Sequence, residues 1–156
     1  MNQPTKLLTP ADLTEVLKAN FAPWIQALNL TVEQTSATHT TLRLPWSPTL
    51  AREGGALSGQ ALMAAADTAT ALALTAARGA YLPMTTIEQH TTFQRPIIDT
   101  DTLITARITK LGRTMAFADI AMTAAAAAAA PPAADAAPPP TDPLLAAHAT
   151  AIYAIL

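Results

Sequence analysis

The sequence predicts an α+β protein in which an antiparallel β-sheet wraps around one long central α-helix. Residues 56–77 form an apolar stretch in which Asp67 is the only charged residue, and Gly79 follows as a natural helix end. After this stretch, apolar and polar residues alternate as they do in β-strands. Because apolar positions lie all around the predicted helix, it should be buried on most sides, and short outer helices are insufficient to bury it.

Cap and turn residues predict the other elements. A first helix should begin at Pro10, with Thr9 as its N-cap and Asp12 in its first turn, and Pro23 should interrupt it. Beyond this break we expect a short helical piece at 24–28. The predicted strands are two within the hairpin 30–44, and then 85–94, 102–111, 114–123 and 144–155.

The chain of 156 residues suits a single domain over residues 1–156. Between the last two predicted strands, residues 124–140 consist of Ala and Pro with a single Asp135. This composition cannot form a packed core, so we interpret it as a flexible insertion. An expanded loop explains it better than a functional role.

Composition excludes several classes of function. A net charge of −2 without a basic run argues against nucleic-acid binding, and the lack of Cys excludes a thiol nucleophile. The three histidines, His39, His90 and His148, have no metal-ligand spacing, and no dinucleotide or phosphate-loop motif is present, so we expect neither metal nor cofactor.

Location and assembly follow from charge and hydropathy. The central Asp67 argues against a membrane span at 56–77, and residues 1–9 lack the apolar segment of a secretory signal, so we expect a cytoplasmic protein. Only 13% of the residues are charged while 51% are hydrophobic. Such a chain gains from covering more of its surface, which favours an oligomer.

Asp67 is the first candidate for chemistry. A carboxylate is costly inside a buried helix, and its helical neighbours offer no positive partner. It could point to solvent or be satisfied by Thr hydroxyls and a backbone donor. A polar cavity or a partner subunit at this position is the more economical explanation, and a carboxylate there can act as a general base or a nucleophile.

The start of the same helix is the second candidate. Gly59 and Gln60 follow a glycine-containing loop, so their backbone N–H groups could bind a developing oxyanion, or the glycines could merely permit a tight turn. Gly59 and Asp67 are eight residues apart, which is roughly 12 Å along a helix. Both groups must lie near one reacting atom. If both take part, two chains must supply them.

The segment LSGQALMAAADTA at 57–69 resembles the hot-dog-fold thioesterases, specifically the phenylacetate-degradation type of acyl-CoA thioesterase. The segments 86–96, 101–116 and 147–153 resemble the same family, so that the similarity extends from about residue 30 to the end without the Ala/Pro tract. The resemblance implies a sheet wrapped around the central helix. It also implies a homodimer or homotetramer with active sites at the dimer interface.

The resemblance also implies roles for individual residues. Asp67 is expected to be the catalytic carboxylate, the Gly59 N–H to polarise the thioester carbonyl, and Thr86 to position the attacking water. Arg95, Lys110 and Arg113 are basic positions that could meet the phosphates of coenzyme A (CoA), or they could be plain solvated charges.

The sequence departs from the family pattern in two places, both of which we assign to substrate binding. Ser58 stands where members commonly carry His, and Arg52 stands where many have Asn or Gln. The sequence therefore predicts hydrolysis of a medium-chain or aryl acyl-CoA. A non-catalytic acyl-CoA-binding or regulatory protein is the main alternative, favoured by Arg52. An enoyl-thioester hydratase ranks lower because no His lies in the helix.

Overall fold

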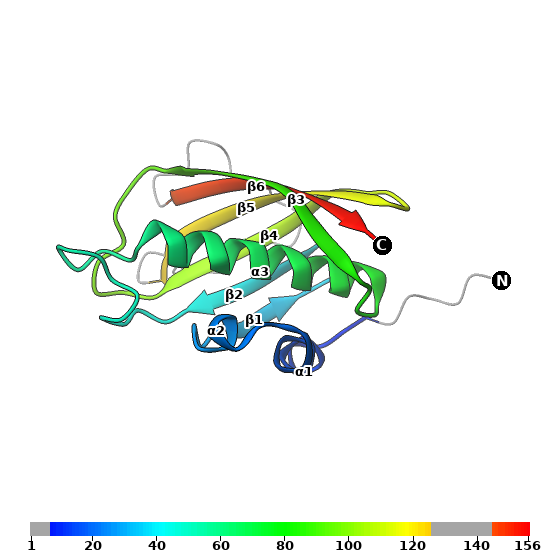
Figure 1. The fold of residues 1–156 in the computed structure, drawn as a ribbon, viewed down its shortest axis with the longest axis horizontal. Coiled ribbons are helices and arrows are strands. Elements are labelled where there is room, and N and C mark those ends of the chain that lie inside the picture. Colours follow the sequence, from blue (N-terminus) through cyan, green and yellow to red (C-terminus); the bar gives the residue numbers. More distant parts are fainter. Residues whose placement is uncertain (1–6, 126–144) are drawn as a thin grey trace.

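The computed structural model describes residues 7–125 and 145–156, which form three helices and one six-stranded antiparallel sheet (Figure 1). The sheet order is β1-β2-β4-β5-β6-β3. This arrangement confirms the predicted α+β fold with a sheet around a central helix. The helices are α1 (Pro10–Asn20), α2 (Pro23–Gln26) and α3 (Gly59–Arg78); the strands are β1 (Thr31–Thr35), β2 (His39–Leu44), β3 (Met84–Phe93), β4 (Thr102–Leu111), β5 (Met115–Ala124) and β6 (Leu145–Ile155).

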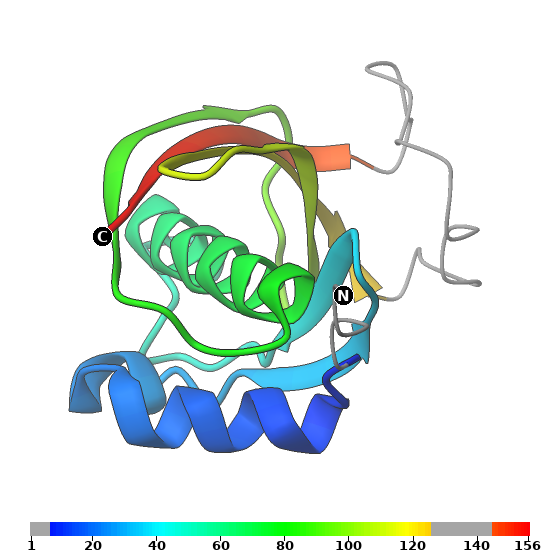
Figure 2. The same ribbon diagram turned by 90° about the vertical axis from the view of Figure 1, so that its right-hand side faces the viewer.

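The sheet curves around α3, as the view along the helix shows (Figure 2). The concave face of the sheet carries small or branched apolar residues that pack on α3. In β6 these are Ala147, Ala149 and Ala151, all buried, with the buried Tyr153 following at the end of the strand. Because alanine projects little from the strand, the sheet can approach the helix closely, and Tyr153 can reach it only where the Ala series ends.

Helix α3 is buried unevenly. Every residue from Thr68 to Ala76 is buried, which confirms the sequence prediction for the second half of the helix. In the first half, Gln60 and Met63 are exposed and Asp67 is half-buried, so that one stripe of the helix lies open. The stripe remains open because a single sheet encloses only part of the circumference of the helix.

Local hydrogen bonds explain how a helix rich in Thr can be buried. The hydroxyls of Thr68, Thr70 and Thr75 donate to the carbonyl oxygens four residues earlier, at 2.8, 2.9 and 2.9 Å. Each buried hydroxyl is therefore satisfied within the helix itself. The helix ends at Gly79, whose φ of 72° is the left-handed conformation predicted for this C-cap.

Near the N-terminus the boundaries differ slightly from those predicted. Thr9 caps α1 in a reciprocal arrangement with Asp12, as expected. Pro23 is the first residue of α2 and not only the break before it. Proline suits this position because the first helical N–H has no partner in any case.

Strand β3 forms one edge of the sheet. It pairs with β6 alone among the described strands, and seven of its ten residues are exposed. A long exposed edge is a ready template for another strand.

The predicted insertion at 124–140 begins with Ala124, the last residue of β5, and from residue 126 it lies outside the described residues. In the part of the chain that the structure describes, no helix is long and apolar enough to cross a membrane.

Candidate active site

The loop before α3 is fixed by hydrogen bonds to three different segments. The Trp46 side-chain N–H donates to the carbonyl of Gly55 at 3.0 Å, and the backbone N–H of Leu57 donates to the carbonyl of Ile97 at 2.9 Å. The backbone N–H of Ser58 donates to the carbonyl of Leu50 at 2.9 Å. These bonds place the first turn of α3 against the segment that follows β3.

The first turn of α3 leaves two backbone donors without a partner among the described residues. The Ala61 N–H donates to the Ser58 side-chain hydroxyl at 3.3 Å, and the Leu62 N–H donates to the Ser58 carbonyl at 3.2 Å. Since the first four N–H groups of a helix have no partner within it, Gly59 and Gln60 supply the remaining free donors. Two such amides at the positive end of a helix can stabilise an oxyanion.

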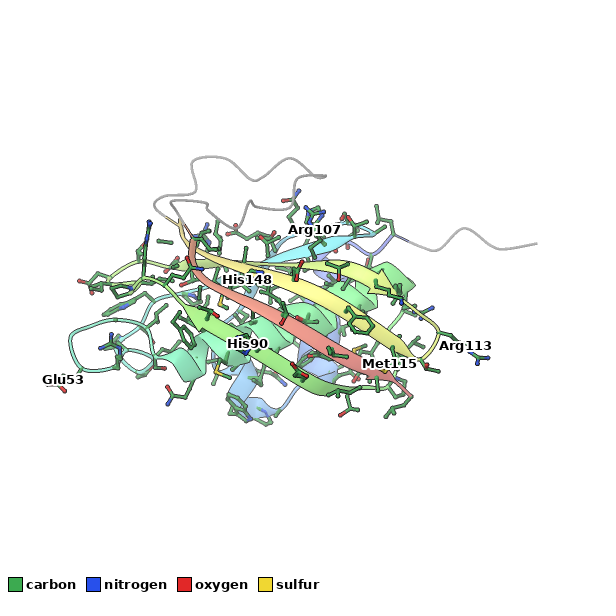
Figure 3. All side chains as sticks on the ribbon, turned by 90° about the horizontal axis from the view of Figure 1, so that it is seen from above. Glu53, His90, Arg107, Arg113, Met115 and His148 are labelled. Carbon is green, nitrogen blue, oxygen red and sulfur yellow. The ribbon has the colours of Figure 1, made fainter. Side chains whose placement is uncertain are left out.

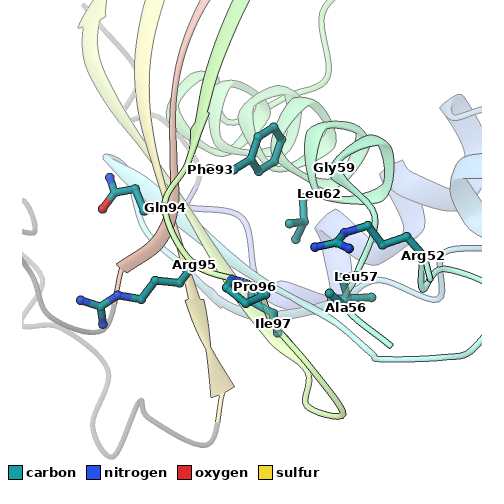
Figure 4. A pocket seen from close by; sticks show the side chains of 10 residues that line it. All are labelled: Arg52, Ala56, Leu57, Gly59, Leu62, Phe93, Gln94, Arg95, Pro96 and Ile97. Carbon is teal, nitrogen blue, oxygen red and sulfur yellow. The ribbon is translucent and has the colours of Figure 1, made fainter. Parts of the chain in front are cut away.

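A pocket of about 370 Å³ lies beside these amides (Figure 4). The Arg52 guanidinium points toward its centre, whereas the side chains of Gln94 and Arg95 extend away from it on the other side of the strand. The lining is otherwise mostly apolar. The lining residues are Arg52, Ala56, Leu57, Gly59, Leu62, Phe93, Gln94, Arg95, Pro96 and Ile97.

The absence of a side chain at Gly59 accommodates the close approach of Phe93. A Cβ atom at position 59 would lie 3.1 Å from Cζ of the Phe93 ring, closer than such contacts normally come. The absence of a side chain therefore lets an aromatic ring from β3 cover the start of α3. Phe93 is itself 48% exposed, so this ring also forms part of the open surface.

Asp67 projects from the exposed stripe of α3 and is held by two hydroxyl groups. The Thr86 hydroxyl donates to its Oδ1 at 2.8 Å, and the Tyr153 hydroxyl contacts the same oxygen. The Tyr153 hydroxyl also lies 2.9 Å from the main-chain carbonyl oxygen of Asp67. Neither partner is charged. The carboxylate is therefore oriented by neutral donors from β3 and β6 while the half-buried site remains open to a reactant.

The Tyr153 phenol is a hydrogen-bond donor that keeps its proton. Burial raises its pKa well above the usual value, and the adjacent Asp67 carboxylate raises it further, while the nearby Thr86 hydroxyl acts in the opposite direction. A phenol with a raised pKa stays protonated across the neutral range. It can therefore donate a hydrogen bond at any pH at which the carboxylate is ionised.

Asp67 and the free amides do not meet within one protomer. Asp67 does not line the pocket that contains Gly59. The eight residues between them along α3 correspond to about 12 Å of helix. The separation expected from the sequence is therefore present in the structure.

Strand β3 runs antiparallel across the exposed stripe of α3. Thr86 contacts Asp67, the Gln89 side-chain amide donates to the Met63 carbonyl at 3.0 Å, and Phe93 covers Gly59. The carboxylate and the amides therefore lie beside opposite ends of the same edge strand.

The structure does not bring all the predicted site residues together. Thr86 lies at Asp67, and Arg52, Gly59 and Arg95 line the pocket, whereas Lys110 and Arg113 belong to the β4–β5 hairpin. Ser58 is the N-cap residue directly before Gly59. Figure 3 shows Arg113 and Glu53, a neighbour of Arg52, at opposite ends of the protomer. Lys110 contacts the Phe117 ring, 5.9 Å from its centre. The role of these two basic residues in CoA binding stays a prediction.

Two residues of the site were missed in the sequence. Tyr153 gave a signal that could have been used, because a tyrosine on the inward face of a buried strand needs a hydrogen-bond partner. Phe93 gave none, since its contact with Gly59 depends on where β3 crosses the helix. Within residues 7–125 and 145–156 no cluster of His, Asp or Glu side chains could hold a metal ion.

Comparison with known proteins identifies the architecture. Residues 54–129 match the family model described as the thioesterase superfamily. No curated protein sequence matches the chain.

Several solved structures share the fold. A candidate thioesterase from a Silicibacter species is 26% identical, with a TM-score of 0.76 over 99% of this chain and 96% of that one. A thioesterase from Haemophilus influenzae is 14% identical, with a TM-score of 0.76 over 97% and 93% of the two chains. Zebra fish thioesterase superfamily member 2 is 19% identical, with a TM-score of 0.74 over 96% and 99%. These findings confirm the resemblance to hot-dog thioesterases and support thioester hydrolysis as the class of reaction.

The geometry at Ser58 predicts a role in stability. Replacing Ser58 with Ala removes the cap of α3 and should lower the free energy of unfolding by about 1 kcal/mol. Ser58→Asp keeps an accepting oxygen and should retain most of the stability. Urea denaturation of both variants measures the difference. Equal stability of Ser58→Ala and the parent protein would contradict the capping role.

Proposed function

We propose that this protein, whose residues 54–129 match the model of the thioesterase superfamily, hydrolyses acyl-CoA thioesters with a medium-chain or aryl acyl group. The observation that carries the proposal is the Asp67 carboxylate, held through one oxygen by two neutral hydroxyls on the exposed stripe of α3. No cofactor is needed for this chemistry. A cytoplasmic location goes with the substrate class and stays a prediction.

In the proposed reaction the thioester carbonyl carbon is attacked and its oxygen becomes an oxyanion. Asp67 either removes a proton from the attacking water or attacks the carbon itself, in which case water then hydrolyses the resulting anhydride. The carbon–sulfur bond breaks, and the products are a carboxylic acid and free CoA. A thiolate leaves readily because thiols are comparatively acidic, so no dedicated acid is required.

The free amides of Gly59 and Gln60 are suited to stabilising the oxyanion. They cannot serve Asp67 of the same chain, because the helix separates them. We therefore assign these donors to the partner subunit in a homodimer. A homotetramer would be a further association of such dimers and is not needed for the site.

The course of β3 supports this dimer. Two copies of an exposed edge strand can pair in antiparallel fashion about a two-fold axis. Thr86 lies beside the carboxylate and Phe93 lies beside the amides. A two-fold axis through the middle of this segment, near Gln89 and His90, would therefore place the carboxylate of one subunit beside the amides of the other. Pairing of β3 would also cover Ile87 and Phe93, which are 54% and 48% exposed in the protomer.

The pocket beside Gly59 is suited to part of the substrate. Its lining combines polar and apolar surface, and its volume of about 370 Å³ falls within the range of small-molecule sites. Arg52 points into it, and Arg95 stands at its outer side, so both could meet phosphate groups of CoA. Lys110 and Arg113 lie at the far end of the protomer, so they could contact the CoA phosphates at this pocket only from the other subunit.

The main alternative is a non-catalytic acyl-CoA-binding or regulatory protein. It is favoured by Arg52, whose guanidinium reaches into the pocket and donates to the Glu53 carbonyl at 3.1 Å. Such a protein would bind acyl-CoA without releasing free thiol. An enoyl-thioester hydratase is less well supported, because the groups that contact Asp67 are hydroxyls and not an imidazole.

The proposal predicts that Asp67→Asn abolishes turnover but not binding. Across a panel of acyl-CoAs, release of free thiol should fall at least about a hundredfold, which corresponds to about 2.7 kcal/mol of barrier. Calorimetric titration should show that the variant still binds a slowly hydrolysed acyl-CoA. Binding without turnover by the parent protein would favour the regulatory alternative. Turnover that survives Asp67→Asn would exclude this carboxylate.

The proposed dimer predicts a specific cross-link. The chain has no Cys, so His90→Cys introduces a single thiol on the outer side of β3 (Figure 3). Residues paired about the axis should have Cα atoms about 4.5–5.5 Å apart, within the range of a disulfide. Under oxidising conditions His90→Cys should give a covalent dimer on a non-reducing gel. Arg113→Cys is the control, and equal cross-linking of both variants would contradict β3 pairing.

A further inference from the structure

Tyr153 reaches Asp67 because of the register of the sheet. Tyr153 on β6 is directly opposite Thr86 on β3, and both side chains point toward α3. Tyr153 is only 3% exposed, and the inward residues before it on β6 are alanines. The sheet therefore delivers two hydroxyl groups, side by side, to one carboxylate.

An irregularity in β3 makes this pairing possible. In a regular strand, residues an odd number apart face opposite sides. Thr86 and Gln89 nevertheless both contact α3, through Asp67 and the Met63 carbonyl respectively. The register shift between Thr86 and Glu88 reconciles the two contacts. Bulges of this kind commonly redirect a side chain beside an active site.

The two hydroxyls act on the same carboxylate oxygen. Thr86 donates to Oδ1 of Asp67, and Tyr153 contacts Oδ1 as well as the main-chain carbonyl of the same residue. From the described residues, Oδ2 receives no hydrogen bond. Burial and the neighbouring carboxylate keep the phenol protonated, so Tyr153 remains a donor while Asp67 is ionised.

We propose that Tyr153 is a positioning residue, which together with Thr86 fixes Oδ1 of Asp67 and leaves Oδ2 as the oxygen that removes the proton from water or attacks the thioester carbonyl. The inference rests on the proposed function and adds to it the identity of the reacting oxygen. The contact with the main-chain carbonyl ties Tyr153 to the helix itself.

The variant Tyr153→Phe removes the donor and keeps the ring. It should lower kcat at least about tenfold, as expected for the loss of a hydrogen bond to a charged group, with little change in KM. Turnover requires the ionised carboxylate, and loss of a donor favours the protonated form. The acidic limb of the pH profile of kcat should therefore move to higher pH.

Matched variants separate positioning from packing. Tyr81→Phe alters the other tyrosine of the chain, which is 38% exposed in the loop after α3, and should leave the pH profile unchanged. Thr86→Val should move the acidic limb in the same direction as Tyr153→Phe, and Thr86→Ser should restore it. Because both hydroxyls act on one oxygen, the double variant should depart from additivity.

A measurement that does not need turnover completes the test. Carbon-13 NMR of aspartate carboxyl groups, with the Asp67 signal assigned by its loss in Asp67→Asn, follows the protonation of this side chain directly. The midpoint of that titration should move to higher pH in Tyr153→Phe and stay in place in Tyr81→Phe. An unchanged midpoint would overturn the inference, whatever the activity.

Hydrolysis of acyl-CoA and the NMR titration of Asp67 together distinguish this inference from the proposed function. If the parent protein hydrolyses acyl-CoA and only the Tyr153→Phe titration is unchanged, the inference fails and the function stands. If the titration moves as expected but no acyl-CoA is hydrolysed, Tyr153 positions the carboxylate and the proposed reaction is wrong.

Discussion

The rise of an α-helix sets the distance on which the rest of this protein depends. Asp67 and the free amides at Gly59 lie on one rigid helix, about 12 Å apart. Neither group can move toward the other without breaking the helical turns between them. A reaction that uses both must therefore take one of them from another chain. The exposed edge of β3 and the open stripe of α3 are the surfaces that such a chain would cover.

The second determinant is the way in which the sheet meets the helix. Alanines along the inner face of β6 allow close packing, and Tyr153 follows where the strand reaches Asp67. The register shift after Thr86 turns a second hydroxyl to the same oxygen. The carboxylate is thus oriented by packing and by neutral donors, without the cost of a buried ion pair.

The sequence predicted much of the fold because the relevant signals are local. The lone charge in residues 56–77, Gly79 as a C-cap and the alternation of β4 needed no knowledge of distant contacts. The candidate site was only partly predictable. Asp67 and Gly59 are conspicuous within one segment, whereas the contact of Tyr153 with Asp67 joins residues 86 positions apart. The separation of Lys110 and Arg113 from the Gly59 pocket likewise depends on how the hairpin is placed.

The most direct test of a shared site is subunit complementation. Gly59→Pro removes one donor at the first helical position, where proline suits a helix once the exposed Phe93 ring shifts to admit its side chain, and Asp67→Asn removes the carboxylate. Each variant alone should be inactive in thiol release from acyl-CoA. A co-expressed mixture should recover about a quarter of the parent activity, because half of the dimers are mixed and each mixed dimer has one intact site. Recovery at that level supports sites made by two chains. A mixture as inactive as its components would contradict the account.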